Sequence, residues 1–329
     1  MPDIAGIDPA ETLDVVERAV TIAVLTYRRP QDLCASLPLL VHQLSTVSWP
    51  GEVLVVDNDP AASARTAVEA LREPRLRYVH EPTPGIAAAR NRALDECRHR
   101  QILVFIDDDE RPSPRWLSSL LATYEQTHPT AVVGPVTSEF ATEPDPWIVA
   151  GGFFRRRAMP TGAAADVAAT NNLLLDLRAV AALQLRFDLR YGLTGGSDNL
   201  FTRQLVARGG RLIWCAEAVV IDVVPAHRLT RDWVLRRTFR MGNGTALVAR
   251  DMASTRSGSV ATLIRLLGSG VLRVLAGCAR ILVGVLIGSL AQRASGARNL
   301  ARGAGLLAGA TGFTYAEYAR RSTVGDDDD

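Results

Sequence analysis

The sequence predicts an α/β fold in which a mostly parallel sheet is covered by helices on both faces. Short apolar runs rich in β-branched residues alternate with segments of helical periodicity through the first 110 residues. Strands and helices that alternate at this spacing form parallel sheets that are buried on both sides. The chain has 329 residues, of which 47% are hydrophobic, so it can bury a core of the size that such a fold needs.

The first four predicted strands are short and strongly apolar. They cover residues 21–26, 53–56, 76–79 and 102–106. Helices are expected between them, over about 33–44, 61–71 and 86–97. The first of these helices has one apolar face, formed by Leu33, Leu37, Leu40, Val41 and Leu44. Pro38 should kink that helix or mark its first turn.

Beyond residue 110 the pattern becomes less regular. Residues 138–170 have weak periodicity, so we expect a long loop there, over the functional site. Helices are predicted over 173–185 and 200–208, with a glycine-rich turn at 192–198 between them. One or two strands are expected within 212–224.

Polar residues follow the predicted strands at the points where they end. Thr26, Asp57, Glu81 and Asp107 all come at or just after the carboxyl end of a strand. In open α/β sheets the ligand site lies beyond these ends. The sequence therefore predicts a functional site at this edge of the sheet.

An acidic run, Asp107-Asp108-Asp109-Glu110, follows the most apolar strand. Neighbouring carboxylates repel one another unless a cation neutralises them. Oxygen ligands suit Mg²⁺ or Mn²⁺, which commonly bridge protein carboxylates to the phosphates of a substrate. The alternative is a solvated acidic turn that caps the following helix, with Pro112 and Pro114 near its start.

Four motifs in one order carry a resemblance to a known family. They are Thr26-Tyr27-Arg28-Arg29-Pro30, Val55-Val56-Asp57-Asn58, the segment 84–91 that begins with Pro84-Gly85, and Phe105-Ile106-Asp107-Asp108-Asp109. The progression resembles the family 2 glycosyltransferases over about residues 20–225. Within that family the chain is similar to the bacterial exopolysaccharide glucosyltransferases of the succinoglycan type. The resemblance implies the GT-A fold, a Rossmann-like, mostly parallel sheet with helices on both faces, and a hexosyltransferase activity.

The resemblance also implies how a nucleotide sugar, with UDP as the expected nucleotide, is bound. Thr26 and Tyr27 would line the nucleotide pocket, and Asp57 would form a hydrogen bond with the base. Arg90 matches the arginine that reaches the nucleotide or its phosphates; the alternative is a solvated helix arginine.

In the same resemblance, Asp107 and Asp109 match the first and last acids of the family's DxD motif. They would hold Mg²⁺ or Mn²⁺ on the donor diphosphate, and Asp107 would also contact the donor. Asp108, in the variable middle position, should point elsewhere. His227 lies where the family has a histidine that can complete the metal shell or touch the diphosphate; the alternative is a structural histidine.

A second carboxylate site is expected in the segment 191–201, which resembles the family pattern GGED-x-D-[LF]. Asp198 matches the base that takes the proton from the acceptor hydroxyl in an inverting transfer. Ser197 stands where the family has a glutamate. The alternative for Asp198 is a helix N-cap. Asn171 and Asn172 resemble the family's acceptor-side asparagine pair, and helix capping is again the alternative.

The C-terminal part differs in charge from the rest. Residues 1–225 are acidic by about six charges and residues 226–329 are basic by about eight. Within the apolar segment 259–310 the longest uncharged stretch is 12 residues, 281–292, whereas a spanning helix needs ~20 apolar residues. A span would therefore have to accept Arg273 or Arg280 near one end. Because Arg265, Arg273 and Arg280 share a helix face, we expect an amphipathic helix in the membrane interface.

Two other readings of this segment remain. Its glycines also permit close helix packing, so a buried helical hairpin or a contact between copies in a homo-oligomer is the alternative. Nucleic acid is not expected as a partner, because aliphatic rather than aromatic residues separate the arginines.

We therefore expect a loose lead-in over 1–18, a GT-A domain over 19–225 and a helical, membrane-associated region over 226–329. The expected activity is transfer of a sugar to a sugar or lipid-linked glycan in surface polysaccharide synthesis. The N-terminus lacks the pattern of a secretory signal, which predicts the cytoplasm or the cytoplasmic face of a bacterial inner membrane.

Two rival functions remain at this stage. A nucleotidyltransferase would be expected to carry a glycine-rich phosphate loop near the first strand, and residues 26–30 contain no glycine. A degenerate transferase that only binds nucleotide is the other rival, and Ser197 is the feature that favours it.

Overall fold

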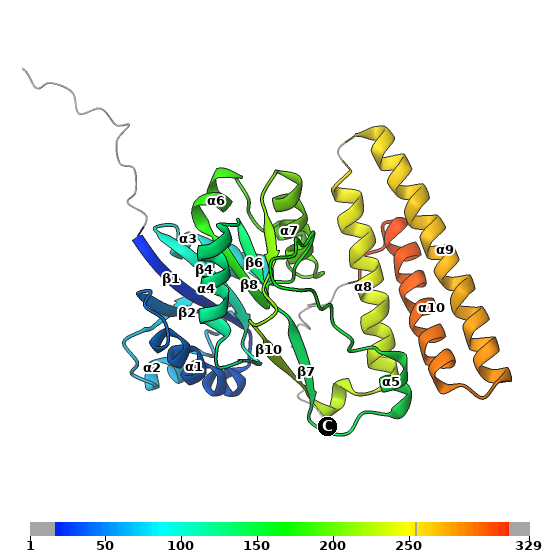
Figure 1. Cartoon of the computed structure of the whole chain (residues 1–329), viewed down its shortest axis with the longest axis horizontal. Coiled ribbons are helices and arrows are strands. Elements are labelled where there is room, and N and C mark those ends of the chain that lie inside the picture. Colours follow the sequence, from blue (N-terminus) through cyan, green and yellow to red (C-terminus); the bar gives the residue numbers. More distant parts are fainter. Residues whose placement is uncertain (1–16, 254, 316–329) are drawn as a thin grey trace, which may run out of the picture.

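The computed structural model describes residues 17–253 and 255–315. The predicted lead-in over 1–18 lies outside the described residues except for its last two, and these already belong to the first strand, β1 (Glu17–Thr26). Figure 1 shows an α/β part on one side and three long helices on the other.

The main sheet has seven strands in the order β3-β2-β1-β4-β8-β6-β9. Besides β1 they are β2 (Gly51–Asp57), β3 (Leu76–His80), β4 (Arg100–Asp107), β6 (Ala131–Val133), β8 (Asn172–Asp176) and β9 (Leu212–Trp214). Only β8 runs against its two neighbours, β4 and β6; the other pairs are parallel. The predicted mostly parallel α/β sheet is thus confirmed.

Helices cover both faces of the sheet because successive strand residues point to opposite sides. Ile22 and Val24 pack with the leucines of α1 (Pro30–Ser45) and with α4 (Trp116–Thr127). Ala23 and Phe105 pack on the other face, with α3 (Ile86–Glu96), α6 (Leu177–Ala182) and α7 (Ser197–Ala207). A short helix, α2 (Arg65–Ala70), precedes β3. Pro38 lies inside α1, so the helix continues through it.

The prediction of a helix over 173–185 is wrong for its first part. Residues 173–175 belong to β8, which lies in the middle of the sheet, and α6 begins only at Leu177. The three consecutive leucines do not alternate with polar residues because β8 is buried on both faces, and such a run cannot be told from a buried helix by periodicity. Asp176 ends the strand and caps α6 by accepting a hydrogen bond from the backbone N–H of Ala179.

Residues 138–170 are not one continuous loop as predicted. They include the end of β7 (Val136–Phe140) and the short helix α5 (Pro146–Gly151). β7 belongs to a second sheet of three strands, with β5 (Glu110–Pro112) and β10 (Val220–Val224), in the order β5-β10-β7. This small sheet places the residues that follow Asp107 beside the C-terminal part of the domain.

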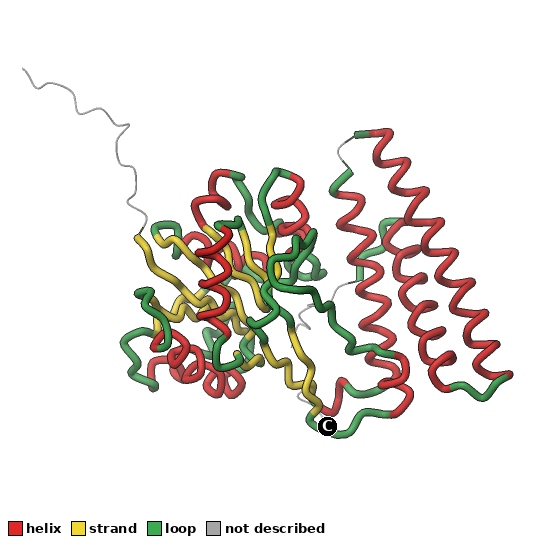
Figure 2. Tube along the Cα trace, in the orientation of Figure 1, coloured by secondary structure: helices red, strands yellow, loops and turns green. Residues whose placement is uncertain are grey.

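Three long helices follow the short 3₁₀ turn at Ala226–Arg228. They are α8 (Arg231–Asp251), α9 (Arg256–Leu286) and α10 (Leu290–Ala310), and they lie side by side, with α9 outermost (Figures 1 and 2). α5 joins them to the α/β part, since Trp147 and Phe153 pack with Val234 of α8 and Ala294 of α10.

Glycines set the close approach of α9 to α10. A Cβ placed on Gly277 would lie 2.8 Å from the backbone oxygen of Gly296, so no larger residue fits there without a shift. Gly270 and Gly284 are also buried against α10. The segment therefore forms the glycine-packed helical hairpin that was the alternative to a lone amphipathic helix.

α9 is also the one helix in the described part of the chain that is long and apolar enough to cross a membrane by length and composition. Most of it is exposed: Leu266, Gly270, Gly277 and Gly284 are its buried residues.

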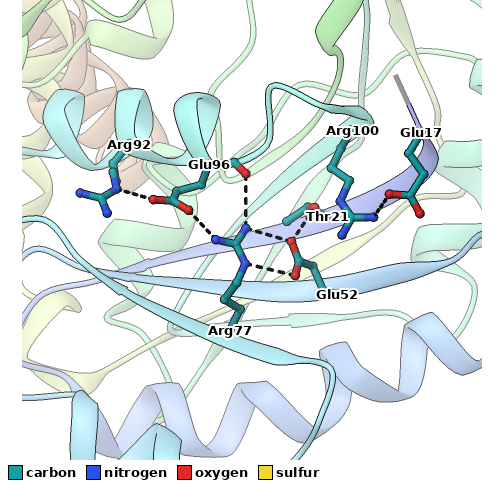
Figure 3. A network of polar contacts seen from close by, with 7 residues as sticks. All are labelled: Glu17, Thr21, Glu52, Arg77, Arg92, Glu96 and Arg100. Carbon is teal, nitrogen blue, oxygen red and sulfur yellow. Dashed lines mark hydrogen bonds and ion pairs between the residues drawn. The ribbon is translucent and has the colours of Figure 1, made fainter. Parts of the chain in front are cut away.

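A network of ion pairs closes the edge of the sheet where β1, β2 and β4 begin (Figure 3). Arg77 Nη2 donates to Glu52 Oε1 over 2.9 Å, and its Nη1 pairs with Glu96 at the end of α3 over 2.5 Å. Arg100 pairs with Glu17 beside it. The network is at the opposite end of the strands from the predicted site, so it belongs to the stability of the sheet.

Candidate active site

The register of the sheet brings the predicted site residues to one edge. Thr26 at the end of β1 stands opposite Asp57 of β2, and Leu25 stands opposite Asp107 of β4. The loops that leave these strands therefore start from three adjacent positions. Tyr27 follows Thr26 there and is half-buried, with the guanidinium of Arg28 5.3 Å from its ring centre.

Asp57 organises the loop after β2 from inside. Its side chain is fully buried, and its oxygens accept hydrogen bonds from the backbone N–H groups of Asp59 and Ala64, both over 2.9 Å, and from the hydroxyl of Tyr78 over 3.0 Å. Burial, followed by the bond to Asp57, raises the pKa of Tyr78 to about 12. The oxygens of Asp57 therefore hold the loop after β2, and its contact with a nucleotide base stays a prediction.

Asn58 connects that loop to the Pro84-Gly85 turn. Its amide group donates to the backbone oxygen of Thr83 over 2.7 Å, and its side-chain oxygen accepts from the N–H of Gly85 over 3.0 Å. Gly85 has φ +113°, which favours glycine, and it begins α3. The loop after β2 thus fixes the start of the helix that carries Arg90.

Asp108 and Asp109 share one partner, Arg29, and differ in their other contacts. Asp108 is buried and accepts a hydrogen bond from the hydroxyl of Thr26 over 2.7 Å. Asp109 is half-buried and pairs with Arg29 over 2.8 Å and with Arg228 over 3.8 Å. Arg29 also pairs with Asp108, over 3.4 Å, so one guanidinium contacts both acids.

Helix capping does not explain this run. β5 intervenes, and α4 begins only at Trp116 with Arg115 as its N-cap. Burial, and next the charge of Asp109, raise the pKa of Asp107. Burial likewise raises the pKa of Asp108 to about 6. Burial and the neighbouring carboxylate of Asp109 thus disfavour the charged form of Asp107.

Glu110 backs the acidic run from the small sheet. It is buried, and its Oε1 accepts a 2.6 Å hydrogen bond from Asn171. Burial, and next the charge of Asp107, raise the pKa of Glu110 well above its usual value. Asn171 is thus placed at the acidic site by a contact that its sequence context did not reveal.

Asn172 is part of the core. It is buried in β8, where its oxygen accepts from the indole of Trp116 over 2.8 Å and its nitrogen donates to the backbone oxygens of Pro135 and Ala218. The expectation that Asn172 contacts an acceptor is not met, because both ends of its amide group are bonded inside the fold. Neither asparagine caps a helix in this structure.

Arg90 is buried, which excludes the solvated-arginine alternative. Its Nη1 donates a 2.6 Å hydrogen bond to the hydroxyl of Ser197, and its guanidinium lies 5.5 Å from the ring centre of Phe187. Its Nε is buried with no hydrogen-bond partner among the described residues. The charge of Arg90 acts on Asp107, whose pKa it lowers against the larger effect of burial.

Asp198 lies in the first turn of α7. The N-cap of that helix is Gly196, with φ +93°, so the alternative interpretation of Asp198 as the N-cap is wrong. Its charge adds to the repulsion that raises the pKa of Asp107. Two carboxylates that are 91 positions apart in the chain, 198 against 107, are thereby brought within electrostatic range.

His227 lies on the exposed side of the turn at Ala226–Arg228, and the next residue, Arg228, is the one that reaches Asp109. Among the residues that the structure describes, no group of three or more His, Cys, Asp or Glu side chains could hold a metal ion. A role of His227 in a metal shell stays a prediction. Asp107 and Asp109 still fit a hard cation that keeps most of its ligands as water and substrate phosphate, as Mg²⁺ does.

Two cations at the site, Arg29 and Arg228, were not assigned to it from the sequence. Arg29 follows the first strand within the motif that starts at Thr26, which was the available signal. Arg228 was noted only as the neighbour of His227. Both reach Asp109 because β1 and the end of β10 meet the acidic loop, and this is a tertiary relation.

Comparison with known proteins gives a consistent result. The family described as "Glycosyl transferase family 2" matches residues 21–175. The succinoglycan biosynthesis protein ExoM of Rhizobium meliloti (strain 1021) is 35% identical over 243 residues, which cover 71% of this chain and 74% of that protein. A hyaluronan synthase of Pasteurella multocida is 28% identical over 119 residues, which are 35% of this chain and 12% of that protein.

Among solved structures, GalNAc-T7 with UDP, GalNAc and Mn²⁺ has a TM-score of 0.53 at 11% identity. The match covers 72% of this chain and 48% of that one, and it shows a shared fold.

Proposed function

This chain belongs to glycosyl transferase family 2 and is a glycosyltransferase, and on that premise we propose that it transfers a sugar from a UDP-sugar, with inversion, to a hydroxyl of a sugar or lipid-linked glycan. The name of the Rhizobium relative supports a role in surface polysaccharide synthesis. Family membership favours sugar transfer over the rival nucleotidyl transfer.

One observation carries the proposal: the acidic pair at the end of β4 and the carboxylate at the start of α7 converge. Asp198 acts electrostatically on Asp107, and Arg90 of α3 donates a hydrogen bond to Ser197, the residue before Asp198. A transferase needs one group at the leaving diphosphate and another at the attacking hydroxyl. The two halves of the site supply carboxylates for both tasks.

In this proposal Asp198 is the base. As the acceptor oxygen attacks the anomeric carbon from the side opposite the diphosphate, a carboxylate oxygen of Asp198 takes the hydroxyl proton. Its place in the first turn of α7 puts the carboxylate near the positive end of the helix. Asn171, which is bonded to Glu110 beside the acidic run, contacts the acceptor in this proposal.

Asp107 and Asp109 would hold a divalent cation, Mg²⁺ or Mn²⁺, next to the donor diphosphate. Bound there, such an ion neutralises charge on the leaving group as a Lewis acid. Arg29 and Arg228, which contact Asp109 in the structure, are positioned to turn toward phosphate oxygens. Arg90 supplies a further buried positive charge on the donor side. Tyr27 would border the nucleotide together with Thr26, whose hydroxyl donates a hydrogen bond to Asp108.

We also propose that the protein works at the cytoplasmic face of a bacterial inner membrane. The exposed apolar side of α9 supports this placement, since lipid would cover it and would bring the site near a lipid-linked acceptor.

The decisive experiment measures UDP release from a panel of UDP-sugars, with and without an acceptor extract and Mn²⁺. Asp198→Asn should lower the rate of transfer by about 10²–10⁴-fold, because it removes the carboxylate base and hardly changes the shape of the side chain. Asp109→Ala should abolish the increase in UDP release that Mn²⁺ causes. Asp95→Asn is the matched control, since Asp95 lies in an exposed pair with Arg186 outside the site.

Unchanged transfer by both site variants would refute the assignment. Metal-dependent UDP binding, seen as a rise in melting temperature, without turnover of any donor would identify a nucleotide-binding scaffold instead.

A further inference from the structure

The outer side of α9 is a continuous apolar surface. Ile264, Leu275, Leu282 and Leu286 are exposed by 66%, 61%, 62% and 75%. They lie on the side of the helix opposite Gly270, Gly277 and Gly284, which face α10. The four arginines of α9 are Arg256, Arg265, Arg273 and Arg280, and none of them interrupts this outer side.

Arginines line the seam where α9 meets α10. We call this group the arginine seam: Arg273 and Arg280 of α9 with Arg298 and Arg302 of α10. The bonds that hold it are to neutral groups, since Arg280 Nε donates to Gln292 over 2.9 Å and Arg298 Nη1 donates to the backbone oxygen of Gly152 over 2.7 Å. Within the described part of the chain, no member of the seam forms an ion pair with a carboxylate.

The sequence explains why the seam lacks acidic partners. Residues 252–315 contain seven arginines and no aspartate or glutamate. The seam is therefore repulsive within itself. Burial, and next the charges of Arg273 and Arg298, lower the pKa of Arg302, and burial followed by the charges of Arg155 and Arg280 lowers that of Arg298. Like charges held together in this way are stabilised by an anion from outside the chain.

The packing argues against a spanning helix. α9 contacts α10 from Gly270 to Gly284. α10 packs on α8 through Gly305 and Gly309. A Cβ atom at either glycine would meet the backbone of α8, at Phe239 and at Asn243 respectively. To cross a bilayer in this arrangement, α9 would have to take the arginines of α10 with it. A helix lying along the surface keeps its outer side in the acyl region and its arginines at the level of the headgroups.

We propose that the arginine seam binds the phosphate groups of anionic phospholipids while the outer side of α9 lies in the bilayer interface. The occupant is a lipid surface, because the apolar side requires an apolar partner, and the seam, on the α10 side of α9, would then lie toward the headgroup phosphates. This inference rests on the proposed membrane location and is independent of the proposed catalytic roles.

The test is sedimentation of the full chain with vesicles of phosphatidylcholine alone or mixed with phosphatidylglycerol. We expect much stronger binding to the mixed vesicles. Arg273→Gln combined with Arg280→Gln should weaken that binding about fivefold for each arginine removed, roughly 30-fold in all. Both side chains are exposed, so the fold should tolerate the change. The matched control is Arg72→Gln with Arg98→Gln, which removes the same charge from exposed positions of the α/β part and should bind like wild type.

A second variant tests the apolar contribution. Leu275→Gln with Leu282→Gln should weaken binding to both kinds of vesicle. Soluble glycerol phosphate, which shares the anion but has no acyl chain, should not compete at concentrations that match the lipid phosphate. UDP release without acceptor, measured in vesicle-free buffer, should be unchanged in the seam variant, so a failed membrane proposal and a failed catalytic one give different results.

Equal binding of the seam variant and its matched control would overturn the proposal. So would equal affinity for the two kinds of vesicle. A protein that binds neither, and that is a dimer in lipid-free buffer until Leu275 and Leu282 are changed, would show that a second copy covers this side of α9.

Discussion

Arg90 in α3 and Ser197 at the start of α7 are joined by a 2.6 Å hydrogen bond between the guanidinium and the hydroxyl. Both side chains are buried. The family pattern has a glutamate in place of Ser197, which would pair with such an arginine as a charge. With a neutral serine there, Arg90 has no carboxylate partner at position 197, and its charge lowers the pKa of Asp107.

Removing that hydroxyl should destabilise the fold. Ser197→Ala leaves Nη1 of a buried guanidinium without its partner, and Nε already lacks one among the described residues. We expect a loss of about 1–3 kcal/mol in the free energy of unfolding, measured by urea denaturation. Ser118→Ala, at an exposed hydroxyl in α4, is the control and should change the stability by less than about 0.5 kcal/mol. Equal stability of the two variants would show that the bond contributes nothing.

Replacing Arg228 should weaken binding of the donor, whereas replacing His227 should not. Arg228→Gln removes the cation 3.8 Å from Asp109, and we expect the KM for the UDP-sugar to rise about tenfold, in line with the loss of one charge-assisted hydrogen bond. The adjacent, exposed His227 provides the control, and His227→Gln should leave KM and kcat near those of wild type. A raised KM in His227→Gln with an unchanged KM in Arg228→Gln would show that the histidine, and not the arginine, contacts the donor.

The ion network of Figure 3 predicts a specific loss of stability in acid. Burial alone would raise the pKa of Glu52, but the hydrogen bond and charge of Arg77 more than offset burial, so the pKa lies below its usual value. A carboxyl group whose pKa is lower in the folded state stabilises the protein above its unfolded pKa, and this contribution disappears as the pH falls through the folded pKa.

Glu52→Gln should therefore cost about 1–2 kcal/mol of unfolding free energy at pH 7, and the difference from wild type should vanish near pH ~3. The measurement is urea denaturation across that range. Glu69→Gln, at an exposed position of α2, serves as the control. A difference from wild type that does not change with pH would contradict the linkage.

The α9–α10 hairpin predicts opposite effects for two glycines on the same helix. Gly277→Val puts side-chain atoms where a Cβ alone would be 2.8 Å from backbone atoms of Gly296 and Leu300, so we expect a loss of about 1–3 kcal/mol and faster proteolysis between α9 and α10. A Cβ on Gly268 meets nothing within 4 Å, and Gly268→Ala should stabilise the helix by about 0.5–1 kcal/mol. If both variants unfold alike in thermal melts, the hairpin is not packed as described.

Several parts of the fold could be predicted because their signal is local. The first four strands are apolar runs bounded by turn residues, and the structure contains each of them, extended by a few residues at their ends. The helix at Leu200 was also expected and begins three residues earlier, at Ser197. β8 was missed because a strand with sheet neighbours on both sides and helices on both faces has no polar face to alternate with.

The residue types of the site were predicted better than their contacts. Asp57 and Asn172 lie close to the predicted places, yet both side chains turn inward to bond the fold. Arg29 and Arg228 turn toward Asp109, although nothing near them in the sequence requires it. Side-chain direction depends on which loops meet, and those loops come from distant parts of the chain.

The sequence by itself determined that a mostly parallel α/β sheet would place Asp107 and Asp109 at a strand's carboxyl end, because strand length, apolarity and the acidic run are local properties. Only the tertiary structure decided that Asp198 comes into the field of Asp107, that Arg90 turns to Ser197, and that α9 packs one side on α10 and leaves the other exposed. These relations depend on how distant elements pack together, and the spacing of residues along the chain carries no record of that packing.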